Sequence, residues 1–275
     1  MNKYLPKIIG SSINFISHFS SRYAAKLAIA LFSSPQKGKL IKNDSSFLET
    51  AKQEKVDYKD ISIMTYNWSG NKETILLTHG WESNTFRWKD LIQILQTLDY
   101  NIVSLDAPAH GKSTGKEFNA IFYSECIHVV AKKYKANIVI GHSVGGMATI
   151  FSQHKYQLPS IKKLILLGSP SNFTGVFKRY VSMMNYNDKV SNAMNQFVLK
   201  HYNHLPEYFS AANFSEEITA KGLLIHDKKD RIIPYKDALD FEKKYTNAKL
   251  ITTKGFGHGL KSDKVYNHII EFLNT

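Results

Sequence analysis

The sequence is poor in cysteine, and this scarcity excludes several kinds of site. Its single thiol, Cys126, cannot form a disulfide within the chain and cannot build a cysteine-rich zinc site. One cysteine fits a reducing compartment, so we expect a cytoplasmic protein. Cys126 falls in a segment with a helical pattern, residues 118–134, and we interpret it as a packing residue rather than a nucleophile.

Long apolar runs and dense basic clusters are also missing. No apolar stretch is continuous enough for a transmembrane span or for a secretory signal. The formal net charge is +13, yet the lysines are scattered and aromatic residues do not interleave them. We therefore expect no nucleic-acid partner. No metal and no organic cofactor is implied, and the oligomeric state is left open.

Acidic residues are absent from the first 42 positions, which hold 7 lysines and arginines. Apolar side chains recur there every three or four residues, which predicts one helical stripe made of Ile9, Ile13, Ile16, Phe19, Tyr23, Leu27 and Leu31. We interpret residues 1–60 as a basic, amphipathic, helical extension with a break near Ser20. The helix could pack on the main body, lie on an anionic membrane through residues 1–42, or be a targeting peptide.

From residue 61 the pattern changes to strands that alternate with helices. Strands are predicted at 61–68, which we interpret as an edge strand, and at 74–78, 101–105, 138–140, 163–167, 222–225 and 249–252. Helices are predicted at 87–98, 118–134, 147–156, 234–245 and 264–273. The alternation predicts an α/β domain over 61–275, with a mostly parallel central sheet flanked by helices. Ligands of such sheets bind beyond the carboxyl ends of the strands.

One interval, about 171–217, is too long for an ordinary crossover connection. It is rich in aromatic residues and methionine, which predicts a helical lid insertion over the active site. Most of these side chains would pack the insertion itself. Others would line an apolar substrate pocket, for which the candidates are Phe173, Phe177 and Met183.

The most informative motif is Gly-His-Ser-Val-Gly at 141–145, between a β-branched strand and a helix. A sharp strand-to-helix turn with small residues two before and two after a serine is a nucleophile elbow. Such a turn lifts the Ser143 hydroxyl out of the sheet. It also leaves the Val144 N–H free at a helix N-terminus, where it can bind an oxyanion.

A serine nucleophile needs a base, and the base needs an orienting carboxylate. His258 follows the last predicted strand on a glycine-rich loop, which makes it the best candidate base. Asp227 and Asp230 both follow the strand at 222–225. We favour Asp230 as the acid and Asp227 as a loop brace, because Asp230 lies three residues further along the loop and nearer the helix that opens at Pro234. The alternative position for the acid, the loop after the preceding strand at 168–172, offers no carboxylate.

An oxyanion site needs a second donor near the serine. The turn His79-Gly80-Trp81 follows the strand at 74–78, so the Trp81 N–H can join that of Val144. The side chains of Trp81 and Phe86 are further pocket candidates, although packing in the core would suit them equally. His79 is interpreted as a residue that braces this loop.

Together these segments resemble the α/β-hydrolase fold superfamily over about residues 60–275. Residues 106–113 are similar to a structural loop of that superfamily, with Ala109 where glycine is usual. The resemblance implies a serine hydrolase with the triad Ser143, Asp230 and His258, which cleaves a small carboxylic ester or thioester through an acyl-enzyme. A carbon–carbon bond hydrolase and a non-catalytic binding scaffold are the alternatives. Serine at the elbow argues against the dehalogenases and epoxide hydrolases of this fold.

Overall fold

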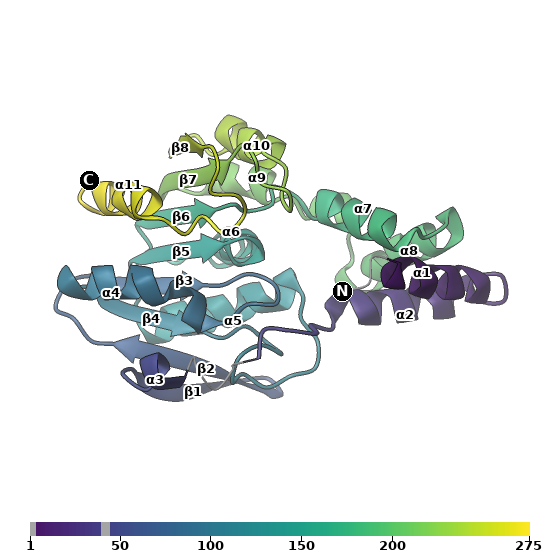
Figure 1. Ribbon diagram of the computed structural model, residues 1–275, viewed down its shortest axis with the longest axis horizontal. Coiled ribbons are helices and arrows are strands. Elements are labelled where there is room, and N and C mark those ends of the chain that lie inside the picture. The colour runs from purple at the N-terminus through teal and green to yellow at the C-terminus, as the bar shows by residue number, and fades with distance from the viewer. Residues whose placement is uncertain (1–3, 40–44) are drawn as a thin grey trace. The chain divides into compact units, whose positions relative to one another are not determined.

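The computed structural model describes residues 4–39 and 45–275 and divides into two units (Figure 1). The larger, here called the sheet unit, comprises Pro35–Ser171 and Ala211–Thr275. The smaller, the helical unit, combines the described residues up to Ser34 with Asn172–Ser210. Two segments far apart in the sequence therefore make one helical unit.

The sheet unit is built on an eight-stranded sheet in the order β1-β2-β4-β3-β5-β6-β7-β8. Its strands are β1 (Lys52–Tyr58), β2 (Ile61–Trp68), β3 (Thr74–Thr78), β4 (Asn101–Leu105), β5 (Ile138–His142), β6 (Lys163–Leu167), β7 (Lys221–Asp227) and β8 (Ala248–Thr253). The β1–β2 and β2–β4 pairs are antiparallel, and all other pairs are parallel. The predicted α/β class with a mostly parallel sheet is confirmed.

The antiparallel end of the sheet differs from the prediction. β2 is not an edge strand, because β1 pairs with it along its length and itself forms the edge. The sheet thus begins at Lys52, inside the stretch interpreted as a helical extension. The physical reason is the composition of β1, Lys-Gln-Glu-Lys-Val-Asp-Tyr, in which only Val56 is buried. Charged side chains are common on edge strands, where they hinder pairing with other chains, so β1 carries no apolar signal.

Helices cover the sheet on both faces (Figure 1). They are α3 (Ser45–Leu48), η2 (Thr85–Trp88), α4 (Lys89–Thr97), α5 (Ala120–Lys133), α6 (Val144–Tyr156), α9 (Ala211–Phe214), η4 (Ser215–Glu217), α10 (Lys236–Lys244) and α11 (Asp263–Leu273). The buried sides of α4 and α11 share one hydrophobic cluster with the sheet, through residues such as Leu91, Leu95 and Ile269. On the strands this cluster uses alternate residues such as Ile75 and Leu77, as expected for side chains that point to one face.

The helical unit contains α1 (Leu5–Ile16), α2 (Ser21–Ser33), α7 (Phe173–Met184), α8 (Asp188–Tyr202) and η3 (Pro206–Tyr208). The short side chains of Ala24, Ala25 and Ala28 are buried on α2, which packs against α8. On α1, a Cβ added to Gly10 would lie 1.7 Å from the Met184 carbonyl oxygen. Glycine at this position therefore permits the close approach of α1 to the end of α7.

Hydrogen bonds fix the same arrangement. The Asn14 side chain donates to the Asn185 carbonyl at 2.8 Å and accepts from the Asn187 N–H at 2.9 Å. Tyr180 donates from α7 to the Ala28 carbonyl on α2 at 3.0 Å. The N-terminal helices thus associate with the inserted segment, a partner that the sequence analysis did not consider.

The single stripe predicted for the N-terminus is divided by a helix break. Ser20 has extended backbone dihedrals and caps α2 by accepting a hydrogen bond from the Tyr23 N–H. Ile13 is buried, whereas Phe19 and Tyr23 are exposed. None of the helices in the described residues is long and apolar enough to cross a membrane.

Candidate active site

Ser143 lies at the strand-to-helix turn between β5 and α6 in a strained backbone conformation. Its φ is 54° and its ψ is −129°, a region that costs a non-glycine residue about 1–3 kcal/mol. The turn requires close packing: a Cβ on Gly141 would lie 2.5 Å from the Gly146 Cα, and one on Gly145 would lie 2.4 Å from the Thr78 carbonyl oxygen. These contacts explain the two glycines of the elbow motif.

Three loops at the carboxyl ends of strands bring Ser143, Asp230 and His258 together. The His258 Nε2 lies 3.0 Å from the Ser143 Oγ, and the His258 Nδ1 lies 2.7 Å from the Asp230 Oδ2. The serine follows β5, the aspartate follows β7 and the histidine follows β8. Their three side chains form a continuous hydrogen-bonded chain within the sheet unit.

The environment of Asp230 fixes the direction of these hydrogen bonds. Burial raises the pKa of Asp230, but hydrogen bonds from His258 and from the Ile232 and Ile233 amides outweigh it and hold the pKa below the usual value. An ionised carboxylate only accepts hydrogen bonds, so Nδ1 of His258 carries the proton. Its Nε2 is then free to accept the proton of the Ser143 hydroxyl.

Asp227 has a different set of partners. Its carboxylate accepts from the amides of Lys229, Gly255 and Phe256 and from the Thr253 hydroxyl. Burial opposes ionisation, but these donors outweigh it and lower the pKa of Asp227 to about 2. The residue therefore joins the loop after β7 to the loop that carries His258, and it makes no contact with the His258 ring among the described hydrogen bonds.

The oxyanion candidates lie beside the serine. A Cβ on Gly80 would be 2.9 Å from the Ser143 Cβ, so the backbone of this turn runs directly against the elbow. Within the described part of the chain, no acceptor is paired with the amides of Trp81 or Val144. His79 braces the turn: its Nε2 accepts from the Ala107 N–H, so its Nδ1 donates to the Gly80 carbonyl. Burial lowers the pKa of His79 to about 4 and keeps the ring neutral.

Two further side chains hold the His258 loop, and the sequence analysis missed both roles. The His142 Nε2 donates to the His258 carbonyl oxygen at a distance of 2.8 Å. The Arg87 guanidinium donates to the Gly259 carbonyl at 3.0 Å. Both contacts join positions more than a hundred residues apart, so no local pattern could have indicated them.

The five pocket candidates have different surroundings. In the sheet unit, Phe86 packs against the hydrophobic core beside Phe47, whereas Trp81 is partly exposed, with its ring edge-on to Phe118. Phe86 therefore packs against the core, the second of the two roles expected for it from the sequence. In the helical unit, Phe173 and Phe177 pack around Phe32, and Met183 is exposed.

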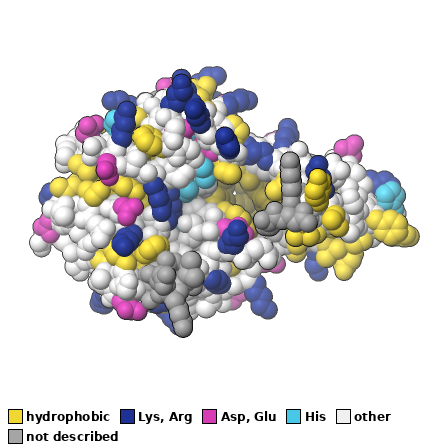
Figure 2. Space-filling view, viewed as in Figure 1, with side chains coloured by type: hydrophobic (Ala, Val, Ile, Leu, Met, Phe, Trp, Pro, Cys, Tyr) yellow, Lys and Arg dark blue, Asp and Glu magenta, His cyan; other side chains and the backbone are white. Residues whose placement is uncertain are grey.

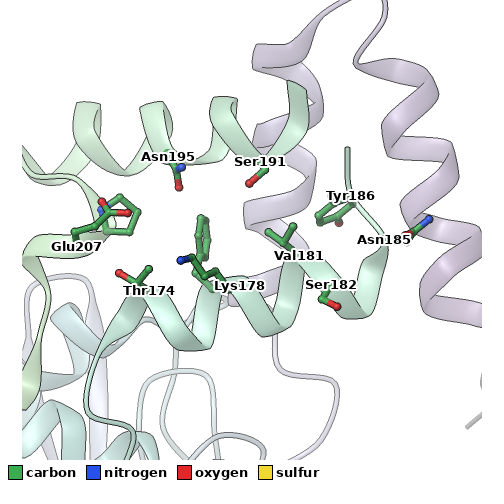
Figure 3. A pocket seen from close by; sticks show the side chains of 11 residues that line it. Thr174, Lys178, Val181, Ser182, Asn185, Tyr186, Ser191, Asn195 and Glu207 are labelled. Carbon is green, nitrogen blue, oxygen red and sulfur yellow. The ribbon is translucent and has the colours of Figure 1, made fainter. Parts of the chain in front are cut away.

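The helical unit also contains a cavity of about 240 Å³ (Figure 3). Asn195 and Ser191 face it from α8, and Lys178 and Val181 face it from α7. Phe177 is among the residues that line this cavity. Polar and apolar side chains both contribute to the lining.

The loop at 106–113 supports the turn that carries Trp81, because the Ala107 N–H donates to His79 and the His110 ring accepts from the Glu82 N–H. Asp106 is buried and accepts from the Tyr66 hydroxyl and the amides of Thr85 and Lys112. Ala109 stands at the position where glycine is usual. Its φ of 64° is a left-handed backbone conformation, which is strained for a residue with a Cβ. Among residues 4–39 and 45–275, no group of three or more histidine, cysteine or acidic side chains is placed to hold a metal ion.

Comparison with known families agrees with the fold. Residues 75–230 match the alpha/beta hydrolase family, and residues 205–275 match a family described as TAP-like protein. The chain therefore belongs to the α/β-hydrolase family, and the resemblance noted from its motifs is confirmed.

Individual proteins match in sequence or in fold. A "Probable serine hydrolase" of Drosophila melanogaster is 32% identical over 107 residues, which cover 36% of this chain and 32% of that protein. Est1E of Butyrivibrio proteoclasticus, solved with ferulic acid, has a TM-score of 0.66 at 18% identity and covers 81% of this chain and 100% of that one. An esterase of Pyrococcus furiosus has a TM-score of 0.66 at 18% identity, with 88% and 97% coverage. The chain matches only about a third of the length of the Drosophila relative.

Proposed function

We propose that this protein is a serine hydrolase that cleaves a carboxylic ester or thioester through an acyl-enzyme on Ser143. The observation that carries the proposal is the hydrogen-bonded chain from Asp230 through His258 to Ser143. The Trp81 and Val144 amides support it, because neither has an acceptor within the described residues and both can stabilise the charge that develops during acyl transfer.

The reaction follows from the protonation states. The Ser143 oxygen attacks the carbonyl carbon while His258 Nε2 takes the hydroxyl proton, and the Trp81 and Val144 amides bind the resulting oxyanion. When the tetrahedral intermediate collapses, His258 returns the proton to the leaving alkoxide or thiolate. Water then attacks the acyl-enzyme while His258 takes a proton from it. His258 returns this proton to the Ser143 oxygen, which releases the acid and restores the Ser143 hydroxyl.

The acyl group is proposed to be apolar, because the insertion is rich in aromatic residues and methionine. That the insertion acts as a lid stays a prediction. Relatives and structural neighbours named as serine hydrolase and esterase make ester chemistry the first choice over carbon–carbon bond hydrolysis.

A fluorophosphonate probe tests the nucleophile. We expect one covalent adduct on Ser143 in the wild-type protein and none in Ser143→Ala. Esters and thioesters of graded acyl length, assayed against the same variant as the blank, then define the substrate class. An unlabelled Ser143 in folded protein would exclude the enzyme, and hydrolysis that persists in Ser143→Ala would exclude the acyl-enzyme route.

A further inference from the structure

Helix α1 is apolar on two opposite sides. One side packs within the helical unit, where Gly10, Ile13 and Ser17 are buried. The other side faces water and carries large apolar side chains, which we call the outer stripe: Tyr4, Leu5, Ile8, Phe15 and Phe19. The spacing of these residues places them along one line of the helix and its final turn.

The outer stripe is unusually exposed for its composition. The exposed fraction is 66% for Phe15 and 80% for Phe19, and their rings touch edge-to-face with centroids 5.4 Å apart. The internal contacts of α1 are already made by its other side, so the stripe is not needed for the packing of the helical unit. The exposed Ser11 and Ser12 lie between the two ends of the stripe, Tyr4-Leu5-Ile8 and Phe15-Phe19. Large apolar side chains exposed together in this way mark an interaction site.

The charge on the two N-terminal helices has one sign. Lys7, Arg22 and Lys26 are exposed on α1 and α2, and no acidic residue occurs among residues 1–43. Figure 2 shows hydrophobic side chains gathered over these two helices with lysines and arginines among them. Tyr23 is also exposed, so the two helices carry two exposed tyrosines, Tyr4 and Tyr23.

We propose that the helical unit docks on an anionic lipid surface, with the outer stripe in the interface and the basic side chains at the headgroups. Helices that lie on membranes combine an apolar face with flanking lysine or arginine and with aromatic residues at the boundary. At 12 residues α1 spans roughly 18 Å, too short to cross a bilayer but long enough to lie along it. A protein partner would have to supply an apolar groove with an acidic rim, whereas an anionic bilayer offers both properties over any area.

Charge and apolar insertion make separable contributions. Each basic residue near an anionic surface strengthens binding roughly fivefold, so removal of three should weaken partitioning about a hundredfold. The electrostatic part should fall with added salt, because the ions screen it. Loss of the two phenylalanine rings should weaken partitioning at least about tenfold at any salt concentration.

Co-sedimentation of the full chain with vesicles tests the proposal. One set of vesicles is phosphatidylcholine with one third phosphatidylglycerol, and the other is phosphatidylcholine alone. The apolar variant is Phe15→Ser with Phe19→Ser, and its matched control is Leu199→Ser, another exposed apolar residue of the helical unit. The charge variant replaces Lys7, Arg22 and Lys26 by glutamine. Its matched control replaces Lys132, Lys243 and Lys264, which are exposed on the sheet unit.

We expect wild type, both controls and Ser143→Ala to sediment with the anionic vesicles, and both test variants to stay largely in solution. All proteins except Ser143→Ala should hydrolyse a short water-soluble ester at the same rate, which shows that the variants fold and separates this proposal from the proposed function. Equal partitioning of test variants and controls would overturn the proposal. So would a self-association of the vesicle-free protein that disappears in the Phe15/Phe19 variant, since the stripe would then join two copies of the chain.

Discussion

Replacement of Asp230 by asparagine tests the assignment of the triad acid. The two oxygens of Asp230 have different partners: Oδ1 accepts from the Ile232 and Ile233 amides at 2.8 and 2.9 Å, and Oδ2 accepts from His258. Asparagine keeps one oxygen and supplies one NH₂ group. Its oxygen should face the two backbone amides, because neither of them can become an acceptor.

The NH₂ group introduced by Asp230→Asn would then face the His258 ring. An imidazole can change tautomer, so Nδ1 would become the acceptor and Nε2 would carry the proton. The Ser143 hydroxyl would lose its base although the geometry of the site is nearly unchanged. Triads with this substitution lose about 10⁴-fold in turnover, which corresponds to about 5.5 kcal/mol of transition-state stabilisation.

The assay is the rate of ester hydrolysis together with the thermal unfolding midpoint, and Asp227→Asn is the control. Asparagine keeps one oxygen, so two of the four donors that meet Asp227 would lose their acceptor, and this variant should be clearly less stable. Its turnover should fall less than about tenfold at a temperature where it is folded, because the Asp227 partners among the described residues do not include the His258 side chain. A reversed order, with Asp227→Asn the more damaged in turnover, would refute the assignment.

Two further predictions concern buried histidines. His142→Leu removes the donor to the His258 carbonyl and should lower kcat about three- to tenfold with little change in KM, whereas His142→Gln should restore most of it; equal kcat values in both would contradict a positioning role. Burial lowers the pKa of His79 and His110 to about 4, so the unfolded chain binds protons first as the pH falls below about 6.5. The free energy of unfolding should therefore decrease between pH 6.5 and 4, by up to about 3 kcal/mol for each histidine. Urea unfolding across this range measures it, and His110→Gln should reduce the slope; a pH-independent value would contradict the argument.

The parallel part of the sheet was predictable because its strands are continuous apolar runs, which buried strands require. The predicted strands at 74–78, 101–105 and 163–167 have the observed bounds. The edge strand β1 was not predictable, because a strand with one buried residue has no apolar pattern. The elbow, the acid and the base each follow a predicted parallel strand. The sequence therefore predicted that the three loops meet at the carboxyl ends of the strands.

Other features depend on contacts that local sequence does not encode. An amphipathic stripe in residues 9–31 predicts that a surface will be covered, but it does not identify the covering partner. Of the seven residues in that stripe only Ile13 is buried, and the segment that α1 contacts lies in the insertion, where Asn14 and Asn185 meet across 171 positions. The supports of the His258 loop by Arg87 and His142 are of the same kind, since an arginine and a histidine have many alternative roles.

The discontinuous make-up of the helical unit has a consequence for synthesis on the ribosome. Asn14 is made 171 residues before its partner Asn185, so α1 and α2 emerge long before α7 and α8 exist. At about 5–20 residues per second, this interval lasts roughly ten to thirty seconds. Throughout that time both apolar sides of α1 are exposed to solvent or to any chaperone or membrane nearby. Helices α1 and α2 are therefore made before their native neighbours and before most of the sheet is complete.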